Sequence, residues 1–434
     1  MVSERNIMTK KAKLGVIGVG GRSWALIECA NNSPDCEVTA ICDLRQDRLD
    51  EKLKMFRDAG MKKPRTYLDY HELLADPNVN CIISPTSWND HLPIAIEAMK
   101  AGKRVAVEVA GAPSLDILWQ TVHTSEETGI PCMLLENCCY DRNVLLTMNL
   151  ARKGLLGELI YCECGYEHYI GMIAVMAEQL DRTWHNAKRN GDLYPTHGIG
   201  PVAKILDINR GNRFLTITST ASKARGFDAY AAEHNYKGSG SIRKFNKGDV
   251  VTSVIKCANG ETVTLVHNIS LPRPYSLHFR VEGTGGIWEE SNGIYIEKMH
   301  GVKKHDPKGF DYIERKWHKI DELYKKYDHP LWKGWDGQFK GGHDGIDEMC
   351  IKAFLHSVAT ETEPPIDVYD LATWMSITCL SEESVAMGGM PVPFPDFTNG
   401  KWVLRKPEPE SKWMLSKVFQ DKQEKRIGKT KNKK

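Results

Sequence analysis

The stretch that decides the fold is Lys13–Ala30, with the sequence KLGVIGVGGRSWALIECA. It begins as an apolar, β-branched run, turns through Gly18, Gly20 and Gly21, and continues with a helical pattern. A strand that turns over glycines into a helix presents backbone N–H groups at the positive end of the helix, where a pyrophosphate can bind. The segment fits GxGxx(G/A/S), with Ser23 in the third small position. It therefore predicts a dinucleotide-binding unit, although such a motif alone can also be an ordinary tight turn.

The segment that follows supports this prediction. Glu37–Asp43, EVTAICD, reads as a second strand that ends in an acid, roughly where a ribose-binding carboxylate belongs. The Asp43 carboxylate would accept hydrogen bonds from the ribose hydroxyls and would repel a 2′-phosphate. We therefore expect a Rossmann domain that binds NAD in preference to NADP.

Strand and helix patterns go on alternating until about residue 153. Further strands are predicted at 65–67, 80–86, 104–110 and 131–138, and helices at 45–59, 91–101, 114–128 and 141–153. Alternation at this spacing predicts a parallel sheet covered by helices on both faces. Ligands of such sheets bind beyond the carboxyl ends of the strands.

Polar side chains gather at these predicted strand ends. They occur in short clusters after the fourth strand (Trp88, Asn89, Asp90 and His91), the fifth (Glu108, followed by the apolar Val109) and the sixth (Glu136 and Asn137). His91 also begins a predicted helix, so it can be a capping residue instead of a functional one. We expect this edge of the sheet to carry the chemistry.

The pattern changes after about Gly157. Strands without intervening helices are predicted at 158–169, 214–222, 250–258, 261–270 and 275–282, and helical patterns return at 346–359 and 371–387. Such runs of strands predict an antiparallel or mixed sheet that is open on one face. The expected class is α/β, with an N-terminal Rossmann parallel sheet and a C-terminal α+β domain whose open sheet is mostly antiparallel. We place the domains at 1–155 and 156–405, followed by a polar, basic tail at 406–434.

The composition narrows the classes of function. A net charge of +2 over 434 residues argues neither for a nucleic-acid partner nor for an acidic substrate, and we expect no nucleic acid. The twelve cysteines form no CxxC pair and no metal-ligand spacing, so we expect reduced, buried thiols and no metal. No segment reads as a signal peptide or a membrane span, which predicts a cytoplasmic protein, although a chain whose signal had been removed would look the same. The open sheet face is a possible contact between subunits of a homo-oligomer.

The residues best suited to chemistry lie in the second half. Tyr194–Pro201, YPTHGIGP, is predicted to be a loop before a helix at 202–208, and its prolines and glycines would aim His197 at a ligand. His343 also lies among glycines, in the segment GGHDG. Tyr166 and His168 are two apart on a predicted strand and would share a face, and Tyr275 begins another strand. Tyrosine and histidine can hold sugar hydroxyls or act as bases, but each of these residues can equally be structural.

Taken together, these residues resemble the glucose-fructose oxidoreductase, inositol dehydrogenase and MocA superfamily, from Lys13 to about Arg405. Its members pair an N-terminal Rossmann domain with a C-terminal sheet domain. The dehydrogenases usually carry Glu-Lys-Pro at the end of the fifth strand, where the lysine assists proton transfer, whereas this chain has Glu-Val-Ala at 108–110. They also tend to carry Asp-x-x-x-His in the substrate domain, and at that spacing this chain has His197 and Pro201.

This combination resembles glycoside hydrolase family 109, the NAD-dependent α-N-acetylgalactosaminidases. The shared motifs are GVGGR, WNDH, EVA, EN, GYEH, YPTHGIGP and GGHxG, with Asp344 where a glycine is often seen. The resemblance implies NAD contacts by Gly21, Arg22, Asp43, Trp88, Asn89, Asp90, His91, Glu108, Val109 and Asn137. It implies sugar contacts by Tyr166, Arg182, Tyr194, Pro195, Thr196, His197 and Tyr275.

A redox route would explain why a glycosidase carries a nicotinamide cofactor. Ordinary glycosidases place two carboxylates across the scissile bond, and no such pair is evident in the sequence. We hypothesise oxidation at carbon 3 of the sugar, loss of the proton on carbon 2, elimination, addition of water and reduction, so that NAD is regenerated. His197 or Tyr194 would accept the hydroxyl proton, and Tyr166 or His343 the proton of carbon 2. The alternatives are an NAD-dependent sugar or cyclitol dehydrogenase and a non-catalytic NAD-binding sensor.

Overall fold

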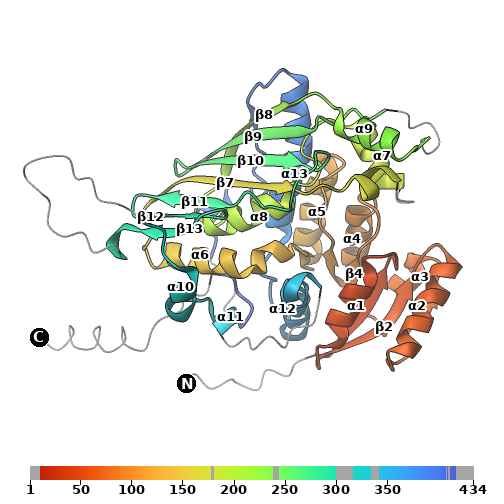
Figure 1. Cartoon of the computed structure of the whole chain (residues 1–434). Coiled ribbons are helices and arrows are strands. Elements are labelled where there is room, and N and C mark those ends of the chain that lie inside the picture. The colour runs from red at the N-terminus through yellow and green to blue at the C-terminus, as the bar shows by residue number, and fades with distance from the viewer. Residues whose placement is uncertain are drawn as a thin grey trace, which may run out of the picture.

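The computed structural model describes residues 10–176, 180–237, 244–299, 316–333, 342–406, 408 and 411–416. Two sheets organise this part of the chain (Figure 1), one formed by its N-terminal third and the other mainly by its middle. Most of the predicted polar tail at 406–434 lies outside the described residues, and in the part that is described Trp413 and Leu415 are buried.

The first sheet has six parallel strands in the order β3-β2-β1-β4-β5-β6. Its strands are β1 (Ala12–Ile17), β2 (Cys36–Cys42), β3 (Arg65–Tyr67), β4 (Cys81–Ser84), β5 (Arg104–Val107) and β6 (Cys132–Leu134). The helices that connect them are α1 (Ser23–Asn31), α2 (Gln46–Asp58), α3 (Tyr70–Ala75), α4 (His91–Lys100) and α5 (Leu115–Thr128). The central strands are apolar and buried on both faces, as a covered parallel sheet requires. The predicted Rossmann sheet is confirmed.

The predicted sixth strand, 131–138, is too long. Beyond Leu134 the chain leaves the sheet, and Asn137–Tyr140 form a 3-10 turn, η1, ahead of α6 (Arg142–Arg152). The Glu136 carboxylate accepts a hydrogen bond from Cys138 N–H at 3.1 Å, which turns the backbone. A side chain that bonds its own backbone competes with the hydrogen bonds between strands. The apolar sequence pattern from which the strand was predicted does not show this competition.

The second sheet has eight strands in the order β13-β12-β11-β7-β10-β9-β8-β14. They are β7 (Leu159–Glu167), β8 (Phe214–Ala221), β9 (Val250–Cys257), β10 (Thr262–Asn268), β11 (Arg280–Gly283), β12 (Gly286–Glu289), β13 (Gly293–Ile296) and β14 (Val392–Pro393). The β7–β10 pair is parallel and the other pairs are antiparallel, which confirms a mixed, mostly antiparallel sheet. Strand β11 begins five residues later than the predicted 275–282, because Ser276 makes only an isolated bridge to Glu167.

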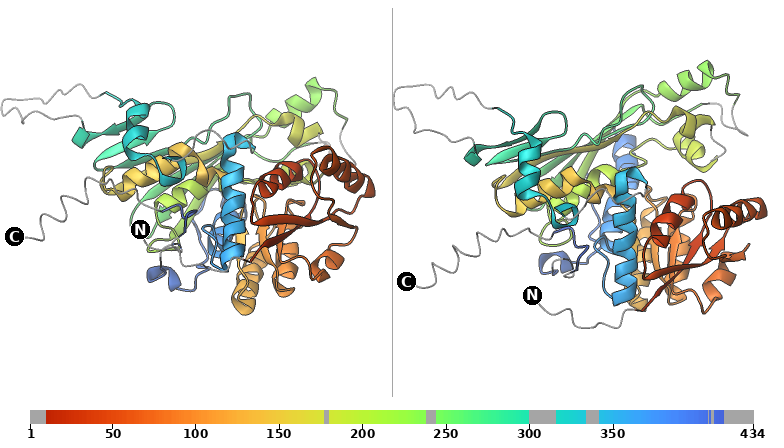
Figure 2. Two further views of the ribbon diagram at one scale, coloured as in Figure 1. Left: turned by 90° about the horizontal axis from the view of Figure 1, so that it is seen from below. Right: turned by 60° about the horizontal axis from the view of Figure 1, so that its bottom comes forward.

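Helices pack on one face of this sheet (Figure 2), and the other face exposes apolar side chains such as Ile160, Leu215 and Val254. The covering helices are α6, α8 (Thr196–Ile205) and α13 (Val368–Ala386), of which α13 also packs on α5. Helix α12 (Ile346–Thr360) lies along α1, although three hundred residues of sequence lie between them (Figure 1). The remaining helices are α7 (Leu180–Lys188), α9 (Gly226–Glu233), α10 (Ile320–Tyr327) and α11 (Pro330–Lys333).

The predicted loop at 194–201 is wrong in part, because α8 begins at Thr196 rather than at Val202. Pro195 already has helical dihedral angles, and Pro201 lies inside the helix. Prolines and glycines normally interrupt helices, which is why the sequence suggested a loop. His197 is therefore held on the first turn of a buried helix.

All twelve cysteines are described, and all are free. Ten are buried and two are partly exposed, which confirms the prediction of free thiols that are mostly buried. Among the described residues, no helix combines the length and the apolarity that crossing a membrane would need.

Candidate active site

The glycine turn between β1 and α1 leaves room for a ligand. Gly18 has φ of 90°, and a Cβ on it would meet the backbone of Thr86 at 3.1 Å. A Cβ on Gly21, by contrast, would meet no atom within 4 Å. Ser23 Oγ donates to Gly20 O at 2.7 Å and closes the turn. The first turn of α1 carries no acidic residue, so its positive end stays available to an anion.

Asp43 lies beside this turn, at the end of β2. Its carboxylate accepts hydrogen bonds from Val19 N–H at 2.9 Å and from Arg45 N–H at 3.0 Å. Arg48 Nη1 lies 3.7 Å from the same carboxylate. The two backbone bonds fix the carboxylate, whose remaining lone pairs can accept from ribose hydroxyls.

Arg22, next to the glycine turn, belongs to an ionic network that joins the first sheet to α12. Its guanidinium donates to both oxygens of Asp347, at 2.7 and 2.9 Å, and from Nε to Glu108 at 2.8 Å. Asn137 Nδ2 donates to Asp347 at 2.6 Å, and His343 Nδ1 lies 2.9 Å from the same carboxylate. Burial opposes ionisation of Asp347, but the bonds from His343 and Arg22 outweigh it and hold its pKa well below the usual value. The Asp347 carboxylate in turn raises the pKa of His343.

The segment after β4 contacts α7. Trp88 N–H donates to Asp181 Oδ2 at 2.8 Å, and Asn89 Nδ2 donates to Asp181 Oδ1 at 3.0 Å. Arg182 Cζ lies 5.0 Å from the centre of the Trp88 ring and 5.3 Å from that of Tyr194, within the range of a cation–π contact. A residue of the strand edge and residues of the second half thus share one site.

Four buried polar atoms at this edge have no hydrogen-bond partner among the described residues. They are His91 Nδ1, Glu136 Oε2, Asn137 Oδ1 and Thr196 Oγ1. Burial lowers the pKa of His91 to about 4, so its ring is neutral at physiological pH. Because unpaired buried polar atoms are rare and costly, a group of them is typical of a site that completes its hydrogen bonds with a ligand.

An aromatic cluster stands next to these atoms. The centre of the Tyr166 ring lies 4.9 Å from that of Tyr194, 5.3 Å from His197 and 6.2 Å from Tyr275. Tyr166 Oη, on β7, lies 2.9 Å from Nδ1 of His168, the first residue after that strand. Burial raises the pKa of Tyr166 to about 12, which keeps the phenol protonated.

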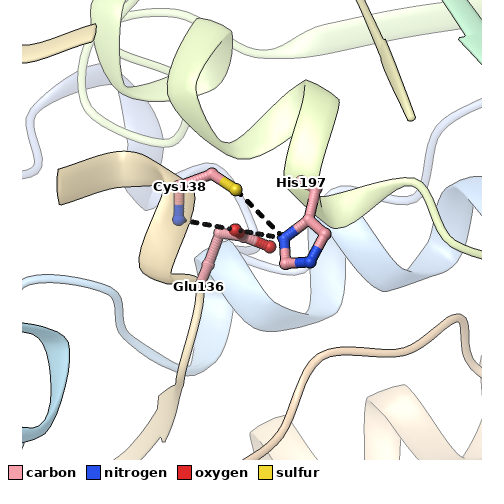
Figure 3. A group of neighbouring side chains, drawn as sticks. All are labelled: Glu136, Cys138 and His197. Atoms are coloured by element: carbon pink, nitrogen blue, oxygen red, sulfur yellow. Dashed lines mark hydrogen bonds and ion pairs between the residues drawn. The ribbon is translucent and has the colours of Figure 1, made fainter. Parts of the chain in front are cut away.

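His197 is held by Glu136 and Cys138, from the turn after β6 (Figure 3). His197 Nδ1 lies 2.7 Å from Glu136 Oε1 and 3.4 Å from Cys138 Sγ. The Glu136 side chain is fully buried. A buried carboxylate at Nδ1 favours the tautomer that carries its proton there, which leaves Nε2 free to accept a proton.

The same three side chains are the group of described residues best placed to hold a metal ion. Glu136, Cys138 and His197 offer ligand atoms that all lie within 4.8 Å of one another. Burial raises the pKa of the Cys138 thiol well above its usual value, which disfavours the thiolate that a metal requires. Glu136 is already bonded to His197 and to a backbone N–H, so the arrangement suits an oriented base better than an ion.

Glycines let α8 approach its neighbours closely. A Cβ on Gly198 would lie 2.7 Å from the backbone nitrogen of Gly165 on β7. A Cβ on Gly200 would lie 2.9 Å from Cγ of Glu136. Because Gly198 and Gly200 lack a Cβ, α8 can pack close to β7 and to Glu136, which places His197 next to both Tyr166 and Glu136.

A buried polar pair fixes the backbone before α8. Asp192 Oδ1 accepts from Tyr194 N–H at 3.0 Å, and His267 Nδ1 accepts from Leu193 N–H at 3.1 Å. Burial raises the pKa of Asp192 to about 7 and holds the pKa of His267 well below its usual value. Because these bonds fix the backbone of residues 193 and 194, they orient the Tyr194 ring toward Tyr166.

The structure brings most of the predicted site residues to one place, and their individual roles stay predictions. Tyr166, Arg182, Tyr194 and His197 lie together, with Tyr275 half-exposed at their edge. His343 belongs to the Arg22–Asp347 network, and its charge still reaches His168 beside that cluster. The other predicted residues line the sheet edge or adjoin α8 and are Gly18, Gly20, Gly21, Asp43, Trp88, Asn89, Asp90, His91, Glu108, Val109, Asn137, Pro195 and Thr196.

Sequence reasoning left four partners of these residues without a role. Glu136 and His168 stood in recognised motifs, and their contacts with His197 and Tyr166 depend on the fold. Asp181 precedes Arg182 directly, and only the structure connects it to the segment after β4. For Asp347 the sequence offered one indication of its partner: it stands four residues after His343, a spacing that often brings side chains together.

Solved structures share this fold at low sequence identity. An NAD binding oxidoreductase from Klebsiella pneumoniae aligns with a TM-score of 0.69 and 16% identity, covering 89% of this chain and 100% of that one. Levoglucosan dehydrogenase, in complex with NADH and levoglucosan, aligns with a TM-score of 0.65 and 17% identity over the same shares of the two chains. At sequence identities this low, the alignments establish a shared fold and nothing more specific.

Sequence comparisons are more specific. Residues 12–134 match the oxidoreductase family with an NAD-binding Rossmann fold, and residues 140–404 match the C-terminal domain of glycosyl hydrolase 109. An alpha-N-acetylgalactosaminidase of Tannerella forsythia is 39% identical over 427 residues, covering 91% of this chain and 88% of that protein. A glycosyl hydrolase family 109 protein of Parabacteroides distasonis is 36% identical, covering 92% and 89%. The chain therefore belongs to glycosyl hydrolase family 109.

Proposed function

We propose that the protein hydrolyses terminal α-N-acetylgalactosaminides with a bound NAD, in a reaction that leaves the cofactor in its starting oxidation state. The observation that carries the proposal is the His197–Glu136 pair beside Tyr166, at the carboxyl ends of parallel strands. The named activity of the Tannerella forsythia relative supplies the substrate class. The cofactor follows from the glycine turn and from the family's Rossmann domain.

The residues present fit NAD. The open space over Gly21 and the uncapped start of α1 suit a pyrophosphate, and Asp43 suits a ribose. The unpaired atoms of His91 and Asn137 lie on the same edge and can bond the rest of the cofactor. When bound, NAD would supply the oxidation of the sugar at carbon 3 and the later return of the hydride.

The chain's own residues would manage the protons. His197, oriented by Glu136, accepts the proton of the carbon 3 hydroxyl at Nε2 as that carbon becomes a carbonyl. Tyr166 then removes the proton on carbon 2, which the adjacent carbonyl acidifies, and the group on carbon 1 departs. After water adds at carbon 1, the same residues return the two protons. A well-placed group of this kind contributes about 10² to 10⁴ in rate.

His343 is the weaker candidate for the second base. Its hydrogen bond to Asp347 raises its pKa and so favours the protonated ring, which cannot accept a proton. Arg182 would hold a sugar hydroxyl or the acetamido oxygen, because its planar fork suits such groups. The Trp88 and Tyr194 rings beside Arg182 offer apolar surface to a sugar ring.

The acids of this site argue against a two-carboxylate mechanism. Such a mechanism needs one acid to protonate the leaving group and a second carboxylate on the other side of the sugar. Glu108, Asp181 and Asp347 are each bound to internal partners, and Glu136 is bound to His197.

The test uses the purified protein with its co-purifying nicotinamide and 4-nitrophenyl α-N-acetylgalactosaminide, without added NAD or reductant. We expect release of nitrophenol over many turnovers with no net change in NADH absorbance, and a loss of most of this activity in His197→Ala. Net production of NADH from the free sugar, without release of nitrophenol, would instead identify a sugar dehydrogenase. Cofactor binding with neither reaction would identify an NAD-binding sensor.

A further inference from the structure

Tyr166 faces a difficulty in the role proposed for it. A phenol whose pKa is raised to about 12 keeps its proton at neutral pH, so it cannot accept a second proton unless its own leaves. The group that receives this proton must touch Oη. His168 Nδ1 does so, at 2.9 Å.

Tyr166 lies on β7, and His168 directly follows that strand, with its N–H still donating to Asn268 O of β10 at 2.9 Å. Residues two apart point to the same face, so Tyr166 and His168 lie side by side. The Tyr275 ring lies edge-on to His168 with 5.2 Å between ring centres, and the Tyr166 ring is likewise edge-on at 5.6 Å. The His168 ring thus lies between Tyr166 and Tyr275, with its Nδ1 next to the hydroxyl of Tyr166.

The surroundings of His168 keep its ring neutral. Burial lowers its pKa, and the nearby His197, Arg182 and His343 lower it further by charge repulsion. A neutral ring can accept the phenolic proton at Nδ1 while it carries its own proton on Nε2. The His168 side chain is only partly buried, so a proton that reaches it can pass on to water.

We propose that His168 is the proton acceptor for Tyr166. In the elimination step, Tyr166 Oη forms a bond to the hydrogen of carbon 2 as its own O–H bond breaks and that proton passes to His168 Nδ1. The electron pair of the C–H bond forms the double bond between carbons 1 and 2, and the leaving group departs with the pair of its bond to carbon 1. When water adds, the protons return along the same path. The proposal rests on the proposed function and assigns a residue that the motif comparison left without a role.

The direct test is His168→Asn, whose amide oxygen can still accept a hydrogen bond from Tyr166 but cannot take its proton. We expect kcat with the nitrophenyl glycoside to fall at least about 10²-fold with KM little changed. The isotope effect of deuterium at carbon 2 should increase, and NADH absorbance should build up during turnover, because oxidation at carbon 3 would outrun elimination. Added imidazole should restore part of the activity of His168→Gly.

The matched control is His278→Asn. His278 is half-exposed and paired with Glu163 and Glu167, which alternate with Tyr166 along β7, and it has positive φ, which asparagine tolerates. We expect it to keep wild-type kinetics.

Two results would overturn the assignment of His168. One is a His168→Asn enzyme with wild-type kcat, and the other is a slow variant that shows no larger isotope effect, no NADH build-up and no rescue by imidazole. Failure of the proposed function would look different, since the wild-type protein itself would then release no nitrophenol, or would release it without exchange of hydrogen at carbon 2.

Discussion

At the scale of single residues, the account depends on Glu136 and His197. The buried carboxylate lies 2.7 Å from Nδ1 and would stabilise the imidazolium that forms when Nε2 takes a proton. We predict that Glu136→Gln lowers kcat by about 10²- to 10⁴-fold, because the neutral amide cannot balance that charge. Steady-state kinetics with the nitrophenyl glycoside, together with titration of NAD binding, measures the effect.

The comparison variant is Cys138→Ala. Its sulfur lies 3.4 Å from the same nitrogen, but a thiol is a weak hydrogen-bond partner. We expect little change in kcat and unchanged NAD affinity in this variant. Equal losses in Glu136→Gln and Cys138→Ala would mean that packing around His197, and not the carboxylate, supports activity.

At the scale of elements, the close approach of α8 to β7 decides where His197 lies. An alanine in a helix is normally about 1 kcal/mol better than glycine. At Gly198, however, a Cβ would lie 2.7 Å from the backbone of Gly165, and such overpacking costs about 1–3 kcal/mol. We predict that Gly198→Ala lowers both Tm and kcat, measured by calorimetry and by the glycosidase assay.

Gly21→Ala is the matched substitution at a glycine with free space around it. No atom lies within 4 Å of the added Cβ, so Tm of the cofactor-free protein should stay unchanged. The methyl group would stand where a pyrophosphate is expected, so NAD affinity should fall. A Gly198→Ala protein as stable and active as the wild type would refute the role given to this contact.

The same elements show what the sequence could and could not predict. Alternating strands and helices predicted all six strands of the first sheet, because burial on both faces leaves a strong apolar pattern, but β4, β5 and β6 are each shorter than predicted. The start of α8 was missed because its prolines and glycines are typical of a loop, and the end of β6 because the Glu136 side chain bonds its own backbone. The shared motifs predicted the site residues, but the pairs Glu136–His197 and Arg22–Asp347 join distant segments, and only the fold brings them together.

At the scale of the whole molecule, the Arg22–Asp347–His343 network ties the glycine turn to the helix α12. The pKa of His343 is raised in the folded protein, so its contribution to stability is fully present below its unfolded pKa and is lost as pH rises through the folded pKa. Because the His343 side chain is 63% exposed, we expect at most about 1 kcal/mol. His343→Gln should therefore have a lower Tm than the wild type at about pH 5.5 and the same Tm at about pH 8.5. A Tm difference that is the same at both values would contradict this assignment.

The central claim is that the glycosidic bond breaks by oxidation and elimination, and the most direct measurement follows the hydrogen on carbon 2 of the sugar. The protein is allowed to hydrolyse 4-nitrophenyl α-N-acetylgalactosaminide in D₂O, and the released sugar is analysed by NMR and mass spectrometry. We predict deuterium at carbon 2, because Tyr166 and His168 exchange the proton they hold with solvent before returning it. Rapid hydrolysis that yields a sugar with no deuterium at carbon 2 would rule out elimination through loss of that proton.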